Sequence, residues 1–376
     1  MGVRIALSVV LLALVLPATA GARSVPQGFY GVVYDGAATN ARPALQDTQF
    51  ARMAKSGVES VRTVFSWADA QPVQGGATNF AATDQLVALA AQHGMSLLPV
   101  VIYAPPWARI DAADPASPPA DPASYAEYLT ELAARYGSSG TFWAEHPEVP
   151  RRPILYWQVW NEPHLTLYWD HPRWQEGYGA LLRAAHTALR RADPRSRVVL
   201  AGLTGTSWTA LQSLYTRGKV RGQFDVAGLQ TYTGTAQHLL LAVQLFRKVL
   251  ARHGAARMPL WLTEMGWPAA KGRIHVPSYQ RTIVTNDAGM AKRLTAGYNL
   301  LARERRARNA RVTRVYWYSW SSPYRRSSTP GTGIFRYSGL FRFNGGAFAT
   351  KPAFSAYVRS AREHEGCVKT TTGRCR

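Results

Sequence analysis

Apolar and amphipathic segments alternate along almost the whole chain. Short runs rich in Val, Leu, Ile and aromatic residues, which favour strands buried on both faces of a parallel sheet, lie at residues 29–35, 58–65, 95–103, 154–160, 197–203, 224–232, 259–264 and 312–320. Segments with helical periodicity separate or follow them, at residues 46–56, 82–93, 122–136, 173–191, 207–217, 238–253, 289–308 and 352–362. This alternation predicts parallel strands joined by helices, and eight such units that close on themselves form a TIM barrel.

An open, doubly wound sheet is the alternative fold. Its common dinucleotide-binding form needs a glycine-rich loop after the first strand, and residues 34–40, "YDGAATN", lack that pattern. We therefore expect one α/β domain at residues 23–376, a single (β/α)8 barrel. Extended loops are expected at 104–121, 266–288 and 321–350, after strand ends and so at the C-terminal face where barrel enzymes carry their active sites.

The N-terminus has the pattern of an export signal. Arg4 precedes the apolar run 5–16, and the small residues 18–20 offer a cleavage site, with maturation expected near Ala20 or Ala22. The apolar run is shorter than the roughly 20 residues of a membrane span. We expect residues 1–22 to be a signal peptide, and the mature protein to be secreted, extracellular or cell-wall associated, without stable membrane insertion.

Two cysteines, Cys367 and Cys375, lie near the C-terminus. In an exported protein they predict a disulfide, the alternative being two free thiols in the tail. Their spacing matches no zinc or redox motif, and the nine histidines show no paired ligand spacing. We therefore expect neither a metal nor a cofactor.

The formal net charge is +22, with 44 Lys and Arg against 22 Asp and Glu. Such a charge attracts anions, including acidic polysaccharides, phospholipid head groups and nucleic acid. The alternative is that the arginines are spread over solvated surfaces, as in residues 302–311. No nucleic-acid-binding motif is present, so we expect no nucleic-acid partner.

Three carboxylates stand at the ends of predicted strands: Asp35 after the first, Glu162 after the fourth and Glu264 after the seventh. In a closed barrel the fourth and seventh strands face each other across the mouth. Hydrolysis of a glycosidic bond needs two such groups, one to protonate the leaving oxygen and one to attack the anomeric carbon or activate water. The alternative role for each carboxylate is a helix cap or an ion pair at a strand end.

Two motifs carry a resemblance to a known group of enzymes. "VWNEP" (159–163) and "LTEMGW" (262–267) resemble the clan A retaining glycoside hydrolases, with family 39-like or cellulase family 5-like features. The resemblance implies that Glu162 is the general acid/base and Glu264 the nucleophile of a double displacement. It also implies a carboxyl separation of about 5–5.5 Å.

The same resemblance assigns supporting roles. Asn161 would bind the sugar 2-hydroxyl, Arg62 would hold the nucleophile ionised, and Tyr232 would donate a hydrogen bond to it. Gln230 stands where the clan often has a histidine, so the polar network is expected to differ there.

Aromatic residues near strand ends are candidates for sugar contacts, because sugar C–H bonds pack on flat apolar faces. We expect Trp320 to form the floor of the subsite at the scissile bond, and Trp107 and Trp267 to line the cleft. Tyr103 and Asp35 are further candidate substrate-binding residues. For the loop tryptophans, packing alone is the alternative role.

These observations predict a secreted retaining glycoside hydrolase that cleaves O-glycosidic bonds of a poly- or oligosaccharide. Two alternatives stay open: a transglycosylase that uses the same intermediate, and a non-catalytic carbohydrate-binding barrel at the cell surface. The expected partner is a carbohydrate, with the basic charge favouring an anionic glycan, and a monomer is expected.

Overall fold

The computed structural model describes residues 22–305, 310–322, 333–344 and 347–375. The predicted signal peptide, residues 1–22, lies outside the described residues except for its last position. Within the described ranges, no helix combines the length and the apolar character needed to cross a membrane.

Eight parallel strands form the centre of the molecule, in the order β5-β4-β3-β2-β1-β8-β7-β6. They are β1 Tyr30–Val33, β2 Ser60–Ser66, β3 Ser96–Ile102, β4 Tyr156–Val159, β5 Arg197–Val199, β6 Ala227–Thr231, β7 Leu260–Met265 and β8 Val312–Trp317. Parallel bridges Val199↔Val226 and Leu203↔Leu229 connect the β5 and β6 segments, so the sheet closes on itself. The predicted (β/α)8 barrel is confirmed, and every predicted strand is present.

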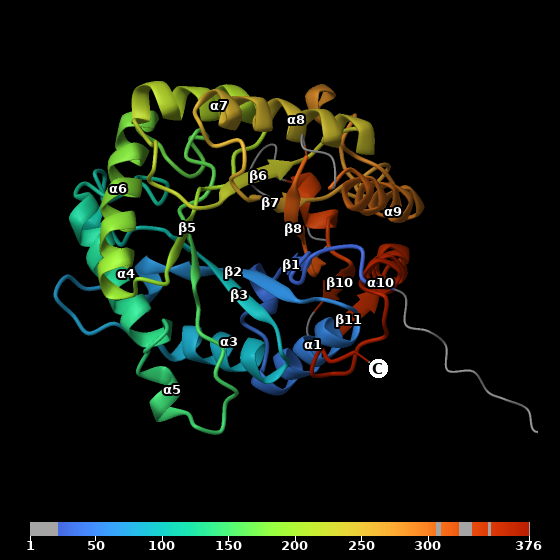
Figure 1. The fold of residues 1–376 in the computed structure, drawn as a ribbon, viewed down its shortest axis with the longest axis horizontal. Helices are drawn as coiled ribbons and strands as arrows, with labels where there is room; N and C mark the ends of the chain where they lie inside the picture. The colour runs from blue at the N-terminus through green and yellow to red at the C-terminus, as the bar shows by residue number, and fades with distance from the viewer. Residues whose placement is uncertain (1–21, 306–309, 323–332, 345–346, 376) are drawn as a thin grey trace, which may run out of the picture.

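Helices surround this barrel (Figure 1). They are α1 Pro43–Lys55, α2 Trp67–Ala70, α3 Ala81–Gln92, α4 Pro122–Tyr136, α5 Phe142–Glu145, α6 Trp174–Ala192, α7 Ser207–Ser213, α8 Ala236–Arg252, α9 Asp287–Glu304 and α10 Pro352–Glu365. Short 3-10 turns lie at η1 Gly36–Ala38, η2 Pro106–Ala108, η4 Ser278–Gln280 and η5 Gly333–Tyr337, and a π-turn, η3 Leu214–Gly218, continues α7.

The segment after β8 differs from the extended loop that we expected at 321–350. Its described part contains a small sheet with the strand order β11-β10-β9. The strands are β9 Ser321–Ser322, β10 Phe341–Asn344 and β11 Ala347–Thr350. Phe341 packs against Trp320 and Phe354, so aromatic contacts join this sheet to the barrel and to α10.

The interior of the barrel is filled by side chains from alternate strand positions. One apolar cluster consists of Val33, Leu98, Val199, Val226, Trp261 and Tyr316, with Tyr156 and Tyr318 packed against it. Because side chains on a strand alternate between two faces, the next inward positions toward the strand ends form the layer above this cluster. In β2, β4 and β6 that layer contains Arg62, Gln158 and Gln230, so a polar floor lies directly above an apolar interior.

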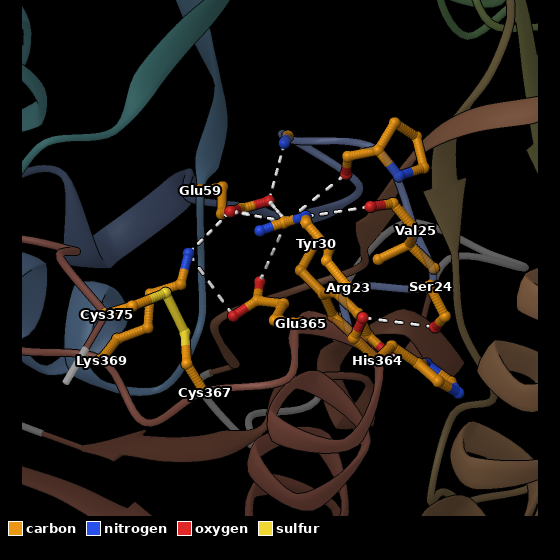
Figure 2. A network of polar contacts seen from close by, with 12 residues as sticks. Arg23, Ser24, Val25, Tyr30, Glu59, His364, Glu365, Cys367, Lys369 and Cys375 are labelled. Carbon is orange, nitrogen blue, oxygen red and sulfur yellow. Dashed lines mark hydrogen bonds and ion pairs between the residues drawn. A yellow bond between two sulfur atoms is a disulfide. The ribbon is translucent and has the colours of Figure 1, made fainter. Parts of the chain in front are cut away.

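The two ends of the described chain are held together at the start of β2 (Figure 2). Cys367 and Cys375 form a disulfide, which confirms the predicted bridge. Between them, Lys369 donates from Nζ to Glu59 Oε1 at 2.6 Å. Arg23 reaches the same carboxylate, with Nη2 at 2.7 Å from each oxygen. Glu59 precedes β2, so this network lies at the N-terminal end of the barrel, opposite the mouth.

Glu365 is the second acid of this network. Burial, and then the neighbouring Glu59 carboxylate, raise the pKa of Glu365 from 4.5 to about 8, against the opposing effect of Lys369 and Arg23. Its oxygens lie 3.4 Å from Lys369 Nζ and 3.8 Å from Arg23 Nη2, and neither oxygen accepts a hydrogen bond within the described residues. Glu59 therefore binds both cations, while Glu365 is held as a neutral acid at pH 7.

We expect this arrangement to make stability depend on pH. In the unfolded chain Glu365 loses its proton near pH 4.5, whereas in the fold it keeps the proton up to about pH 8. The unfolded state thus releases a proton in that window, and the free energy of unfolding falls as pH rises from about 4.5 to 8. Glu365→Gln should remove this loss, so that at pH 8.5 the variant is roughly 1–3 kcal/mol more stable than wild type in urea denaturation.

Glu59→Gln is the matched control. It weakens the charge-assisted bonds to Arg23 and Lys369 and should lower stability at both pH 5 and pH 8.5. A Glu365→Gln protein that is less stable than wild type at both pH values would contradict the neutral assignment.

Candidate active site

Glu264, in β7, lies at the centre of a hydrogen-bond network at the barrel mouth. Its Oε1 accepts from Arg62 Nη1 at 2.8 Å and from Gln230 Nε2 at 3.0 Å. The hydroxyl of Tyr232 donates to Oε2. Glu264 is buried, with 7% of its surface exposed. The structure therefore brings Arg62 and Tyr232 to the predicted nucleophile, with three donors arranged around one carboxylate.

Arg62 connects the walls of the barrel through all three guanidinium nitrogens. Besides Nη1, its Nε donates to Gln158 Oε1 and its Nη2 to Asn161 Oδ1, each at 2.8 Å. The residue is 3% exposed, and a buried guanidinium with these acceptors is fixed in position by its planar geometry. Gln158 was not among the predicted site residues, although a lone amide in the apolar strand "ILYWQVW" was a usable signal.

Asn161 is oriented by donors on both sides. Its Oδ1 accepts from Arg62 and, at 2.8 Å, from Gln230 Nε2. Its Nδ2 donates no hydrogen bond within the described part of the chain and is available to a ligand. Gln230 thus links Asn161 to Glu264 at the position where we expected a departure from the clan pattern.

The packing beneath this network requires a glycine. A Cβ on Gly202 would lie 2.5 Å from Gln230 Nε2 and 2.6 Å from Thr263 Oγ1. The Gly202 carbonyl also accepts from the backbone N–H of Glu162 at 3.2 Å. The bare backbone at this position therefore supports both Gln230 and Glu162.

Glu162 occupies a different environment from Glu264. It is 7% exposed, and its carboxyl group makes no hydrogen bond with any described residue. Burial, and then the Glu264 carboxylate, raise the pKa of Glu162 well above its usual range, while Arg62 opposes the shift. One carboxylate surrounded by donors and one unpaired acid at the same mouth is the arrangement that separates a nucleophile from a proton donor.

Three strand-end residues at the mouth have left-handed backbone conformations. Tyr103 and Trp160 have φ of 64°, and Glu162 has φ of 40°. Such conformations cost non-glycine residues about 1–3 kcal/mol each and persist where surrounding contacts impose them. Trp160, for example, donates from Nε1 to the Tyr168 carbonyl at 2.7 Å. The fold therefore holds this rim in a conformation that the local sequence does not favour.

A third carboxylate, Asp35, follows β1. Burial, and then the Glu264 carboxylate, raise its pKa from 3.8 to about 6, while Arg62 opposes the shift. Asp35 makes no side-chain hydrogen bond within the described residues. Nor do any three His, Cys, Asp or Glu side chains group as a metal site there.

Aromatic residues complete the mouth. The pKa of Tyr103 is raised by burial and by Asp35 and Glu264, and that of Tyr318 by the same causes, so both rings lie close to these carboxylates. Phe335 packs against Tyr232 at 4.7 Å and Tyr318 at 6.1 Å between ring centroids. Tyr103 and Tyr232 were among the predicted site residues, whereas Tyr318 and Phe335 were not.

Two predicted subsite tryptophans lie elsewhere. Trp320 has no exposed surface, packs against Phe341 and Phe354, and donates from Nε1 to Gln49 Oε1 at 3.2 Å. It therefore lies between the barrel wall and α1 and α10, because β8 ends at Trp317 and the strand alternation does not reach Trp320. Tyr318 packs against the interior cluster instead.

Trp267 is also fully buried. Its Nε1 donates to the Thr233 carbonyl at 2.5 Å, and its ring lies over Gly297 of α9, where a Cβ would approach within 2.9 Å. It seals the barrel against α9 and does not line the cleft. Trp107 is partly exposed in the turn after β3, where it contacts Trp67 and donates to the Gln71 carbonyl.

Comparison with known proteins shows a likeness in fold. No sequence-family profile matches the chain, and no curated protein matches it. A family 39 glycoside hydrolase from the gut symbiont Bacteroides cellulosilyticus WH2 aligns with a TM-score of 0.64 and 17% identity, over 91% of this chain and 64% of that chain. The β-glycosidase BGL167 aligns with a TM-score of 0.62 and 16% identity, over 90% of this chain and 97% of that chain.

A GH5_18 protein from Bifidobacterium longum subsp. infantis also aligns, with a TM-score of 0.57 and 17% identity, over 87% of this chain and 75% of that chain. The chain spans slightly less than two thirds of the family 39 structure, 64% of its length. At these identities the likeness establishes the fold. The chain is a (β/α)8 barrel with the architecture of these solved structures, among which are the family 39 and family 5 types that its motifs resemble.

The ion pair of Arg62 and Glu264 gives a prediction about stability. Replacing Arg62 with Met leaves a buried carboxylate without its cation, which costs about 3–5 kcal/mol of stability in comparable cases. We expect a loss of that size for Arg62→Met in guanidinium denaturation at pH 7. The double variant Arg62→Met/Glu264→Gln should recover part of it, and equal losses in the single and double variants would show that the two residues are not coupled.

Proposed function

We propose that this protein is a secreted retaining glycoside hydrolase that cleaves O-glycosidic bonds of a poly- or oligosaccharide. The observation that carries the proposal is the contrast between Glu162, an unpaired acid with a raised pKa, and Glu264, a carboxylate bonded by Arg62, Gln230 and Tyr232. The likeness in fold to a family 39 glycoside hydrolase and a β-glycosidase supports it. Export and an extracellular or cell-wall location rest on the N-terminal sequence pattern alone.

In the proposed reaction, Glu264 attacks the anomeric carbon while Glu162 gives its proton to the leaving oxygen. A covalent glycosyl-enzyme forms, and Glu162, now a carboxylate, takes a proton from the water that releases the sugar. Asn161 contributes its free Nδ2 to the sugar 2-hydroxyl. Arg62 and Tyr232 hold Glu264 for in-line attack, so that no rearrangement is needed at the moment of reaction.

The intermediate can also be passed to a sugar acceptor. A transglycosylase would use the same two carboxylates, so product analysis with an added acceptor separates it from a hydrolase. A non-catalytic carbohydrate-binding barrel would bind the sugar without turnover, and the different environments of Glu162 and Glu264 favour the enzyme over it.

The raised pKa of Glu162 predicts the shape of the pH profile. A general acid must carry its proton, so kcat/KM should stay high through neutral pH and fall as pH rises through that raised value. Glu162→Gln should lower kcat/KM about 10²–10⁴-fold on glycosides with poor leaving groups and abolish the basic limb. Glycosides of 2,4-dinitrophenol, which leave without a proton, serve as the control and should be affected far less in the first step.

Azide rescue distinguishes the roles of the two carboxylates. In Glu264→Ala, azide can occupy the vacated position of the nucleophile and should give a glycosyl azide of inverted configuration. In Glu162→Ala, azide attacks the glycosyl-enzyme and should give a glycosyl azide of retained configuration. NMR of the products reads both outcomes, and wild-type activity in Glu264→Ala without azide would refute the assignment.

A further inference from the structure

Asp35 faces the barrel axis at the mouth. Val33, two residues before it, lies in the interior apolar cluster and pairs with Arg62 across β1 and β2. Tyr34, between them, points outward, where it packs against Phe50 at 5.2 Å and donates to the Ala38 carbonyl at 2.7 Å. Because successive side chains alternate, the Asp35 carboxylate lies in the polar layer above Val33, beside Arg62.

The Asp35 carboxylate has no structural partner in the described part of the chain. It occupies the N-cap position of the 3-10 turn η1, yet its side chain makes no capping hydrogen bond. Glu162, which is 7% exposed, lies at the same mouth, and its carboxyl group also makes no hydrogen bond with any described residue. Asp35 is half-buried, so its carboxylate is open to a ligand at the mouth and can accept hydrogen bonds from it, whereas Glu162, the acid with the raised pKa, can donate its proton there.

The charge at the mouth is negative in spite of the net charge of +22. Among the described residues of the network, the carboxylates of Asp35 and Glu264 face a single cation, Arg62, while Glu162 keeps its proton because burial and Glu264 raise its pKa. Each guanidinium nitrogen of Arg62 already donates to Gln158, Glu264 or Asn161. A ligand carboxylate would therefore meet carboxylates, whereas sugar hydroxyls would meet the acceptors that they need.

The surface cations do not reverse this preference. Exposed charges are screened over about 10 Å at 0.1 M salt, whereas the carboxylates at the mouth act on the ligand directly. The basic composition can attract an acidic polymer to the outer surface, but among the described residues of the network Arg62 is the cation at the reaction centre, and its three nitrogens already donate to protein acceptors.

We infer that the reaction centre selects a neutral sugar, and that Asp35 is the specificity-determining residue, accepting hydrogen bonds from sugar hydroxyls and excluding uronic acids. This inference rests on the proposed function, because it concerns the sugar that Glu264 attacks. It narrows the expectation of an anionic glycan to units outside the reaction centre.

The test compares nitrophenyl glycosides that differ only at C6: glucosides with glucuronides and galactosides with galacturonides, as both anomers. Wild type should show kcat/KM at least about 100-fold higher on the neutral member of the pair that it processes. Asp35→Asn keeps the size of the side chain but removes its charge and one acceptor. It should lower kcat/KM on the neutral sugar about 10–100-fold and narrow the neutral-to-uronide ratio at least about 10-fold, since a site built to bind a hydroxyl discriminates strongly.

Asp47→Asn is the matched control. Asp47 is exposed on α1, where it pairs with His93, so this variant removes one negative charge away from the mouth and should leave the ratio unchanged. Thermal unfolding monitors folding: Asp35→Asn loses no hydrogen bond within the described residues and should melt no lower than wild type.

Failure of the inference is distinguishable from failure of the proposed function. Preference for a uronide, with turnover lost in Glu264→Ala, would overturn the role of Asp35 and leave the hydrolase intact. An unchanged ratio in Asp35→Asn would do the same. Absence of turnover on the whole panel would count against the hydrolase. Calorimetric titration of wild type with methyl glucoside and glucuronate then tests the inference by binding, and equal or tighter binding of glucuronate overturns it.

Discussion

The guanidinium of Arg62 is the interaction on which the mouth of this barrel depends. It joins β2 to Gln158 and Asn161 at the end of β4 and to Glu264 in β7, through three separate nitrogens. A buried cation is costly unless it is paired, and here each acceptor that it requires is also a part of the candidate site. The same contacts that satisfy Arg62 therefore fix the orientation of Asn161 and the position of Glu264. The hydrogen bonds that stabilise the buried Arg62 are therefore the same ones that arrange the candidate site.

Around this centre the fold gives three carboxylates three environments. Glu264 is surrounded by donors, Glu162 is buried without one, and Asp35 is half-buried and open to the mouth. Chemically similar side chains are thus separated by position alone, which is how one site can contain a nucleophile, a proton donor and a hydrogen-bond acceptor for the substrate. The opposite end of the barrel uses the same principle for stability, since Glu59 binds Lys369 and Arg23 while Glu365 stays protonated.

Strand periodicity predicted the barrel and its strands, and the two cysteines of an exported chain predicted the disulfide. The contacts of Arg62 and Tyr232 with Glu264 were implied by the resemblance to the clan A glycoside hydrolases. The sequence did not predict which side chains point into the barrel beyond the end of a strand. Trp320 was placed in the site and Tyr318 was missed, because β8 ends at Trp317 and the alternation of side chains does not continue to Trp320. The role of Gln158 could have been predicted from the sequence, because a polar side chain inside a buried strand must have a hydrogen-bond partner.

The net charge of the chain favours an anionic partner, whereas the candidate site favours a neutral sugar. The two preferences are compatible because they act over different distances. A charge of +22 describes the whole chain and governs how it meets an acidic polymer in solution. In the proposed reaction, the unit that is cleaved is selected by groups within hydrogen-bond reach. Among the described residues these are the carboxylates of Asp35 and Glu264 and the acid Glu162, against one fully engaged arginine. Under the proposed function, the protein associates with an anionic polysaccharide through its outer surface and cuts only at a neutral sugar. In that proposal, net charge sets where the protein accumulates, while the three carboxyl groups at the mouth set which bond is placed for attack.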